Sequence, residues 1–429
     1  MHVLPQLRKL EERYPDEIAI VGVHSGKYTA ERDTSRIRDA SIRLGATHPT
    51  INDRQFRLWR AYAVRAWPTL VAVDPRGYVI GMHAGEFTAD SLAPFIDRTI
   101  ATARAAGTLV PGRLHRESDP PTTVTDRLSF PGKVSLDDNR LAIADSGHRR
   151  VLVGTLDDTG HRMRVDHAVD GSDGRIATST DQCFINPQGI VLAGDVMYVA
   201  DAGRHTILEC ALRTGTARIL AGTGHPLRSA VDEAQGALSS PWDLALDGDT
   251  LFVAMAGIHQ LWTVSRSSGR AEVFSGSGAE ELHDGSHGEA ALAQPMGICL
   301  ADLGLYVADA ESSAIRVADR DPSGGVRTIV GTGLFDFGDV DGVGDAVRMQ
   351  HQQGIALATD GRLLVCDSYN DALKWVDPVS RRAESWVRGL HEPSGLAIGE
   401  RFVYVADTNA HRVAVVDRRS GETGTLIIE

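Results

Sequence analysis

The sequence has few cysteines, few aromatic residues and no excess of basic residues. Its 429 residues include four cysteines, and aromatic side chains make up 6%. The 44 Lys and Arg residues against 57 Asp and Glu residues give a formal net charge of -13. Nucleic acids and anionic membranes attract basic proteins, so this balance argues against either as the primary partner. No apolar run approaches the roughly 20 residues that span a bilayer.

The cysteines are too dispersed for a redox or metal motif. Cys183, Cys210, Cys299 and Cys366 form no Cys-x-x-Cys pair and show no metal-ligand spacing. Cys299 and Cys366 lie inside apolar strand patterns, as expected of buried thiols in a reducing compartment. The first 17 residues are charged and helical in pattern, unlike a secretory signal. We therefore expect a cytoplasmic protein without a metal or another cofactor.

What the sequence does contain is a six-fold internal repeat. A Val-Ala-Asp segment or a near copy of it follows a Pro position at an almost constant distance of 14 or 15 residues. The pairs are Pro131/Asp145, Pro187/Asp201, Pro241/Met255, Pro295/Asp309, Gln352/Asp367 and Pro393/Asp407. Successive Pro positions are 56, 54, 54, 57 and 41 residues apart. A constant inner spacing with a variable outer spacing indicates one supersecondary unit with loops of different lengths.

Each copy predicts four short strands. In the fourth copy these are the apolar segments 295–300, 305–309, 314–318 and 326–331, with turn residues between them. A lone four-stranded sheet buries its faces poorly, whereas sheets stacked radially cover one another. We therefore predict an all-β six-bladed propeller over residues 128–429. An Asp-Gly pair, Asp284-Gly285 or Asp341-Gly342, precedes two of the blades at equal spacing.

The recurrent Asp ends a strand, where a carboxylate can accept hydrogen bonds from the amides of its own turn. We interpret these residues as structural turn residues: Asp145, Asp201, Asp309, Asp367 and Asp407. Met255 takes the position in the third copy, which a turn tolerates and a catalytic ring would not. The fourth residue after this position varies, and we interpret it as loop variation rather than a metal ring: Arg149, His205, His259, Ser313, Asp371 and His411.

The first 105 residues lack the repeat and alternate between helix and strand patterns. Helices are expected at 4–14, 34–44 and 89–103, and strands at 18–24, 66–74 and 78–82. This alternation indicates an α/β domain at 1–105. Residues 106–127, which include Pro120-Pro121, are expected to form a linker.

Several segments resemble a known family. Ala406-Asp407-Thr408-Asn409-Ala410-His411-Arg412-Val413 is similar to the NHL repeat, and Trp67-Pro68-Thr69 at a strand start resembles the thioredoxin-like fold. Together they resemble the NHL-repeat-containing thioredoxin-like proteins over almost the whole chain. The resemblance implies an α/β thioredoxin-like domain before the propeller, with Trp67, Pro68 and Thr69, the proline in cis, lining a substrate groove beside a redox dithiol.

The chain departs from that family at both ends. The resemblance places a strand and a Cys-x-x-Cys just before a segment like residues 2–5, and here Met1 stands in their place. We expect the true coding region to start upstream; the alternative is a module that has lost its dithiol. Without that strand, the strands at 18–24 and 69–74 would lack a shared neighbour and leave exposed edges. A β-domain that follows the propeller in longer relatives is absent after Glu429.

Three functions stay open on these grounds. The first is a scaffold that binds a protein partner through propeller loops. The second is a thiol-disulfide oxidoreductase, which the chain as given cannot be, since no catalytic residue is present. The third is a propeller hydrolase or lactonase, for which no matching set of Glu and Asn residues recurs. The acidic loop of Asp336, Asp339, Asp341 and Asp345 partly resembles a calcium loop, but Gln350 replaces the final Glu of an EF-hand. Neither a substrate nor an oligomeric state can be read from the sequence.

Overall fold

The structure is a computed structural model, and it describes residues 3–112, 127–169, 184–302 and 304–429. Cys183, Met1, His2 and most of the expected linker lie outside these residues. The chain divides into two compact units, Met1–Thr123 and Val124–Glu429. Within the parts described, no helix is long and apolar enough to cross a membrane.

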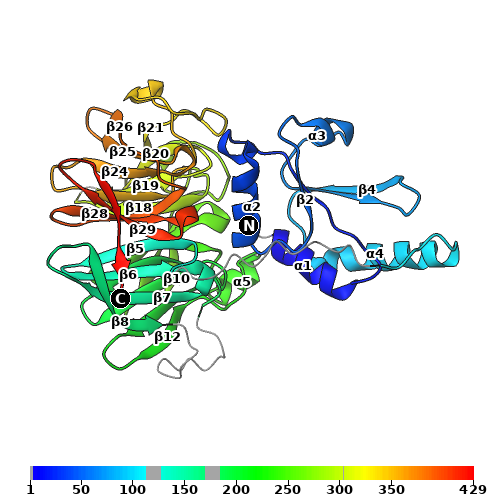
Figure 1. The fold of residues 1–429 in the computed structure, drawn as a ribbon, viewed down its shortest axis with the longest axis horizontal. Coiled ribbons are helices and arrows are strands. Elements are labelled where there is room, and N and C mark those ends of the chain that lie inside the picture. Colours follow the sequence, from blue (N-terminus) through cyan, green and yellow to red (C-terminus); the bar gives the residue numbers. More distant parts are fainter. Residues whose placement is uncertain (1–2, 113–126, 170–183, 303) are drawn as a thin grey trace. The chain divides into compact units, whose positions relative to one another are not determined.

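The second unit is a six-bladed β-propeller, as the repeat predicted (Figure 1). Each blade is an antiparallel meander whose innermost strand begins at the Pro position, or shortly after it in the fifth blade. The first three blades consist of β5 (Pro131–Asp137), β6 (Arg140–Asp145), β7 (Arg150–Leu156) and β8 (Arg162–Val169); β9 (Pro187–Ala193), β10 (Val196–Asp201), β11 (Thr206–Ala211) and β12 (Thr216–Ala221); and β13 (Pro241–Asp247), β14 (Thr250–Met255), β15 (Gln260–Ser265) and β16 (Ala271–Ser275).

The last three blades repeat this order, and two of them gain a fifth strand from the Asp-Gly segments. They consist of β17 (Gly285–Ser286), β18 (Pro295–Leu300), β19 (Gly304–Asp309), β20 (Ala314–Asp319) and β21 (Gly325–Val330); β22 (Gly342–Val343), β23 (Gly354–Leu357), β24 (Leu363–Asp367), β25 (Ala372–Asp377) and β26 (Arg382–Arg388); and β27 (Pro393–Ile398), β28 (Phe402–Asp407), β29 (Arg412–Asp417) and β30 (Thr423–Thr425). A short helix, α5 (Ala230–Ala234), lies between the second and third blades.

The final strand closes the ring. β31 (Ile427–Ile428) pairs in parallel with β8 of the first blade, so the end of the chain does not belong to the sixth blade alone. Six buried hydrophobic clusters lie at the six blade interfaces, one between each pair of neighbours. The cluster between the last and first blades contains Leu141, Phe402 and Ile428. Radial stacking therefore buries the two faces that a single sheet would expose.

The first unit alternates helices and strands, but its strands form two separate sheets. β1 (Gly22–His24) pairs in parallel with β2 (Thr50–Asn52), and β3 (Thr69–Val73) pairs antiparallel with β4 (Val79–Ala84). The helices are α1 (Val3–Arg13), α2 (Thr34–Arg43), α3 (Arg57–Ala61) and α4 (Ala89–Ala105). The strand expected at 18–24 is shorter than predicted, and β2 and α3 were missed. A complete thioredoxin-like sheet is not evident, since no described pairing joins β1 to β3.

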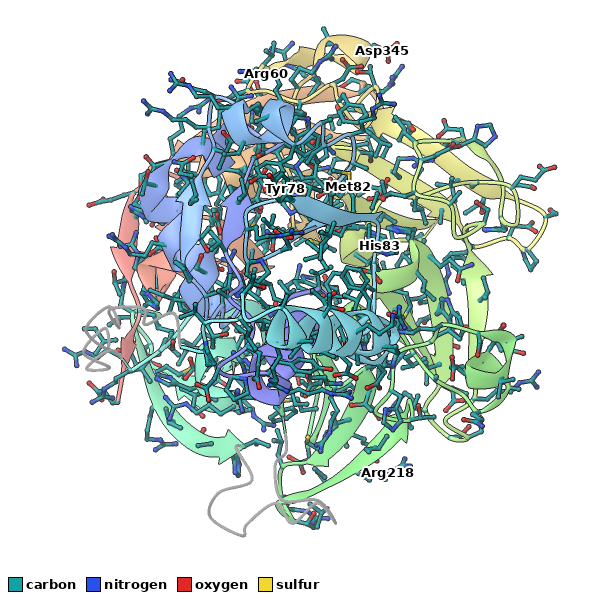
Figure 2. All side chains as sticks on the ribbon, turned by 90° about the vertical axis from the view of Figure 1, so that its right-hand side faces the viewer. Arg60, Tyr78, Met82, His83, Arg218 and Asp345 are labelled. Carbon is teal, nitrogen blue, oxygen red and sulfur yellow. The ribbon has the colours of Figure 1, made fainter. Side chains whose placement is uncertain are left out.

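A small core holds the first unit together. Leu7, Leu10 and Tyr14 from α1 and its end pack against Phe87 and partly buried side chains of α4. Local signals explain the helix starts: Asp33 accepts hydrogen bonds from the amides of Ser35 and Arg36, and Thr88 and Ser91 form a capping box. Large apolar side chains of the β3–β4 hairpin stay exposed, among them Tyr78 at 66% and Met82 at 50%. Figure 2 labels both residues on the β3–β4 hairpin.

Candidate functional site

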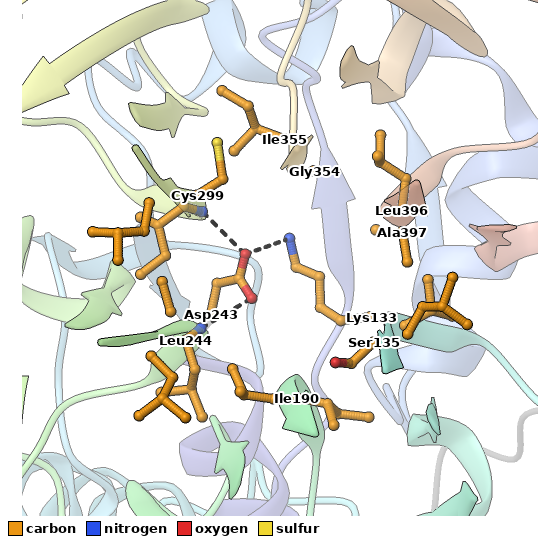
Figure 3. Close-up of a pocket in the computed structure, with 18 of the residues that line it drawn as sticks. Lys133, Ser135, Ile190, Asp243, Leu244, Cys299, Gly354, Ile355, Leu396 and Ala397 are labelled. Atoms are coloured by element: carbon orange, nitrogen blue, oxygen red, sulfur yellow. Dashed lines mark hydrogen bonds and ion pairs between the residues drawn. The ribbon is translucent and has the colours of Figure 1, made fainter. Parts of the chain in front are cut away.

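The centre of the propeller contains a cavity of about 340 Å³ lined by the innermost strand of every blade (Figure 3). Its walls are mostly aliphatic, with side chains such as Ile190, Leu244, Ile355 and Leu396. A short apolar run follows each Pro position in the sequence, and each run forms an inner strand that lines the cavity. The cavity is thus an apolar channel whose chemistry depends on its few polar residues.

Lys133 and Asp243 cross the channel toward each other. The Lys133 Nζ lies 3.5 Å from the Asp243 Oδ2, and it also donates to the main-chain carbonyl oxygen of Gln353. The Asp243 carboxylate accepts hydrogen bonds from the amides of Leu244 and Ile298, both at 3.0 Å. Burial raises the pKa of Asp243, while Lys133 and these amides act in the opposite direction. Figure 3 shows the two side chains meeting inside the cavity, with a dashed line between their charged ends.

Sequence analysis missed this pair although the repeat contained the signal. Both residues stand two positions after the blade's Pro, where the other four blades have Gly. A Cβ on Gly189 would lie 2.6 Å from the Cα of Asp243, and one on Gly395 would lie 2.8 Å from the Cα of Lys133. At these positions the main chains of neighbouring blades therefore approach each other too closely to leave room for a Cβ atom on Gly189 or Gly395. The two exceptions to the Gly rule carry opposite charges, which could have indicated an ion pair.

The channel offers little for catalysis among the residues the structure describes. Its one lysine and one aspartate hold each other, and Cys299 is a poor nucleophile because burial raises the pKa of its thiol. No group of three or more His, Cys, Asp or Glu side chains in the described ranges could hold a metal ion. The arrangement places a paired charge in the channel rather than an unpaired reactive group.

The recurrent aspartates are all fully buried, but only part of their interpretation is correct. Asp201 does accept hydrogen bonds from its own turn, from the amides of Gly203 and Arg204. Each of the five carboxylates also accepts one or more from the main chain just before its own blade's Pro position. The donors are the amides of Ser129, Ile185, Asn186, Ala293, Gln350 and His391. These residues therefore tie the blade entry to the second strand, because a buried carboxylate needs several donors.

The fourth residue after each recurrent position is not mere loop variation, which corrects our interpretation. All six residues adopt a left-handed backbone with φ between 51° and 57°. Five of the side chains accept a hydrogen bond from the amide just before the next blade's Pro position. These bonds are Ser240 to His205, Gln294 to His259, His351 to Ser313, Glu392 to Asp371 and Phe130 to His411. Arg149 has no acceptor atom. The shared property is a short side-chain acceptor, so we call these five bonds the interblade latches.

The acidic loop between the fourth and fifth blades is neutralised by basic side chains. The buried Lys374 donates to Asp339 at 2.6 Å and to Asp341 at 2.9 Å, and Arg388 also binds Asp339. Arg381 pairs with Asp345 at 2.6 Å.

Asp341 also accepts a hydrogen bond from the amide of Ser385, a residue of β26. Asp284 accepts from Arg316 and Thr328 in the equivalent way. Asp339, Asp341 and Asp345 are thus paired with the protein's own cations, which argues against the interpretation of this loop as a calcium site.

The residues expected to line a substrate groove lie at the start of β3. The Trp67–Pro68 peptide bond is cis, and the Trp67 indole nitrogen donates to the carbonyl oxygen of Ser25 at 2.8 Å. The Thr69 hydroxyl donates to the carbonyl oxygen of Ala66. Trp67 packs against Trp59 with 4.4 Å between ring centroids. The Phe56 ring approaches Trp67 edge-on, so Trp67 is held at a surface by one hydrogen bond and by contacts with two aromatic rings.

A second hollow, of about 710 Å³, lies between the fourth and fifth blades. Tyr306, Val317 and Val326 of the fourth blade line it on one side, and the β25–β26 turn at Pro378 and Val379 lines it on the other. Val379 is 92% exposed. We call this hollow the blade 4–5 groove.

Comparison with known proteins agrees with this architecture. No family model matches the chain. The chain is 34% identical over 491 residues to NHL repeat-containing protein 2 of Homo sapiens, an alignment that covers 100% of this chain and 66% of that protein. It is 35% identical to the same protein of Gallus gallus, with 97% and 64% covered. The chain belongs to the NHL repeat-containing family. It spans about two thirds of the length of these relatives.

Other members and partial relatives extend this picture. Protein SUPPRESSOR OF QUENCHING 1, chloroplastic, of Arabidopsis thaliana is 36% identical to this NHL repeat-containing chain over 476 residues, which cover 44% of that protein. Thioredoxin-like protein YneN of Bacillus subtilis is 26% identical over 94 residues, or 22% of the chain. Among solved structures, a nidogen/laminin complex reaches a TM-score of 0.47 at 16% identity, with 67% of this chain and 93% of that chain covered. At that TM-score the likeness carries no functional argument.

Proposed function

We propose that the propeller is a protein-binding scaffold and that a partner docks in the blade 4–5 groove. The observation that carries this proposal is the highly exposed Val379 beside a groove of about 710 Å³, whose lining includes Tyr306, Val317 and Val326 as well as the polar side chains of Ser286, Asp319, Ser323 and Arg327. Exposed apolar side chains that border a concave surface favour a protein contact. The central channel supports the same reading, because its lysine and its aspartate are paired with each other.

The sixth blade offers a matched control for this groove. The turn after β25 reads Asp377-Pro378-Val379-Ser380, and the turn after β29 reads Asp417-Arg418-Arg419-Ser420. In both turns the Asp accepts hydrogen bonds from the amides two and three residues later. The two turns therefore share a main-chain geometry while Val379 and Arg419 differ in polarity.

Photo-crosslinking tests the proposal. A benzophenone amino acid at position 379, in the full chain expressed in its native source, should give one discrete adduct with another protein. The same amino acid at position 419 should not give that adduct. No adduct at position 379, or the same adducts at both positions, would show that the groove is not a specific docking site.

We further propose that the first unit is a thioredoxin-like domain in the cytoplasm, with thiol-disulfide exchange as a second function. The order of helices and strands, the partial likeness to YneN and the position of Trp67 and Pro68 before β3 support this proposal. Thiol exchange requires a dithiol, and no cysteine precedes Cys183 in the sequence. The intact mass and N-terminal sequence of the native protein decide the matter. A Cys-x-x-Cys before His2 would support exchange, and a native start at Met1 would refute it.

A further inference from the structure

The segment between β2 and β3 has a charge opposite to that of the chain. Residues 54–73 contain four arginines, Arg54, Arg57, Arg60 and Arg65, and no Asp or Glu. The chain as a whole has a formal net charge of -13. A local run of unbalanced arginines in an acidic protein needs an explanation, because surface charges of one sign repel one another.

This segment is held in a defined shape by one buried carboxylate. Asp53 accepts hydrogen bonds from the amides of Arg57 at 2.7 Å and Trp59 at 2.9 Å, and from the Ser25 hydroxyl at 2.9 Å. These bonds fix the start of α3. Because the carboxylate is used by these donors, it does not pair with the guanidinium groups nearby. The arginines are thus displayed on an ordered element.

The four arginines are exposed and lack acidic partners in the described parts of the chain. No carboxylate lies within ion-pair distance of any of them there, and Arg60 donates only to the carbonyl oxygen of Gln55, at 2.8 Å. Figure 2 shows Arg60 on the outer side of α3. Many other surface arginines pair with an Asp or Glu side chain, as Arg76 does with Asp74 and Arg362 with Asp360. Free guanidinium groups are suited to bidentate binding of carboxylates.

Aromatic side chains lie within the same segment. Trp59 packs on Trp67, Phe56 approaches both rings edge-on, and Arg32 lies 6.0 Å above the Phe56 ring. Trp67 is 49% exposed and Tyr62 is 39% exposed. Trp, Tyr and Arg are the residues most enriched where alanine substitution weakens protein interfaces strongly. We call the set Arg54, Arg57, Arg60, Arg65, Trp59 and Trp67 the arginine–tryptophan surface.

We propose that the arginine–tryptophan surface binds an acidic, apolar-containing segment of another protein. Carboxylates of the segment pair with the arginines, and its apolar side chains cover the exposed edges of Trp67 and Tyr62. A single-stranded nucleic acid fits less well, because bases stack on open ring faces and Trp59 and Trp67 cover each other. The acidity of the rest of the chain also disfavours a long polyanion.

The test uses the full chain and three fluorescein-labelled probes of similar length. The first is a peptide with the Glu-Glu-Leu repeat, the second is its Lys-Lys-Leu counterpart, and the third is an oligothymidylate. Binding is followed by fluorescence anisotropy. The variant R57E/R60E reverses two charges of the surface, and K9E/R98E makes the same change in net charge at two exposed positions of the same unit. A Glu at position 57 is compatible with the first turn of α3.

We expect the Glu-Glu-Leu peptide to bind wild type and K9E/R98E alike, and R57E/R60E to bind it about tenfold more weakly or worse. Equal weakening in both variants would overturn the proposal, because the peptide would then sense net charge alone. Tighter binding of oligothymidylate than of the acidic peptide, or no binding of the peptide, would also overturn it. This inference does not depend on the blade 4–5 groove, since V379R should leave peptide binding unchanged whether or not a partner docks there.

Discussion

At the scale of single residues, the channel depends on two exceptions to a glycine rule. Lys133 and Asp243 replace Gly at equivalent positions of the first and third blades and pair across the axis. Each is buried, so neither charge can be satisfied by water if the other is removed. The two charges are therefore stabilised in the channel only as a pair.

We predict that D243A destabilises the protein by about 3 kcal/mol, because it leaves Lys133 buried without its carboxylate. The double variant K133M/D243A should be less destabilised than the sum of the two single variants. Urea unfolding of all four proteins gives the coupling energy. Additive effects would mean that the two side chains do not act as a pair.

Asp339 gives a residue-scale prediction about pH. The hydrogen bond from Arg388 is the largest cause that lowers the pKa of Asp339, and Lys374 acts in the same direction. A carboxyl whose pKa is lower in the folded state adds stability above its unfolded pKa, about 3.9, and this stability is lost as pH falls through the folded pKa.

D339N should therefore cost about 1 kcal/mol near pH 6, a modest value because the Arg388–Asp339 pair is partly exposed. The difference between wild type and D339N should shrink as the pH falls from 5 to 3. Denaturant unfolding across this range tests it. A difference that stays constant down to pH 3 would show that this carboxylate does not contribute through its charge.

At the scale of secondary-structure elements, the interblade latches connect the third strand's start in one blade to the entry of the next. The left-handed backbone at His205, His259 and His411 orients each imidazole so that its Nδ1 accepts from the following blade. The hydrogen bond from the Phe130 amide to His411 differs from the others because it joins the last blade of the ring to the first.

We predict that H411A destabilises the protein by about 1–2 kcal/mol, since the partly buried Phe130 amide loses its acceptor. H411N should lose less, because Asn tolerates a positive φ and keeps a side-chain acceptor. Thermal unfolding compares the two variants. Equal losses in H411A and H411N would mean that the latch hydrogen bond is not what stabilises this junction.

The elements also show what can be predicted from sequence. The strands of the fourth blade matched their predicted ranges closely, because apolar alternation and turn residues are local signals. The latches were missed because their common property, an acceptor atom on a left-handed residue, is shared by three different residue types: His, Ser and Asp. β2 and α3 were missed because three and five residues are too short for a periodic pattern.

At the scale of the whole molecule, six hydrophobic interfaces and a closing strand make one ring. The number of blades followed from the repeat, but the pairing of β31 with β8 did not, because two residues carry no repeat signal. The groove between the fourth and fifth blades could not be predicted either, since it depends on how neighbouring sheets are placed.

We predict that removal of residues 426–429 destabilises the entire propeller. Leu426 and Ile428 are buried between the first and sixth blades, and each should contribute about 2 kcal/mol. The midpoint of denaturant unfolding should shift for all spectroscopic probes together. If hydrogen exchange increased only in β8 while the midpoint stayed unchanged, the ring would not depend on this closure.

The central claim is that the blade 4–5 groove is where the propeller binds a protein. The most direct measurement is the affinity of the partner crosslinked at position 379 for wild type, V379R and R419V, by isothermal titration calorimetry. We predict that V379R weakens binding by about tenfold or more, as at the centre of an interface, and that R419V does not. Equal affinity of the partner for wild type and V379R would contradict the claim.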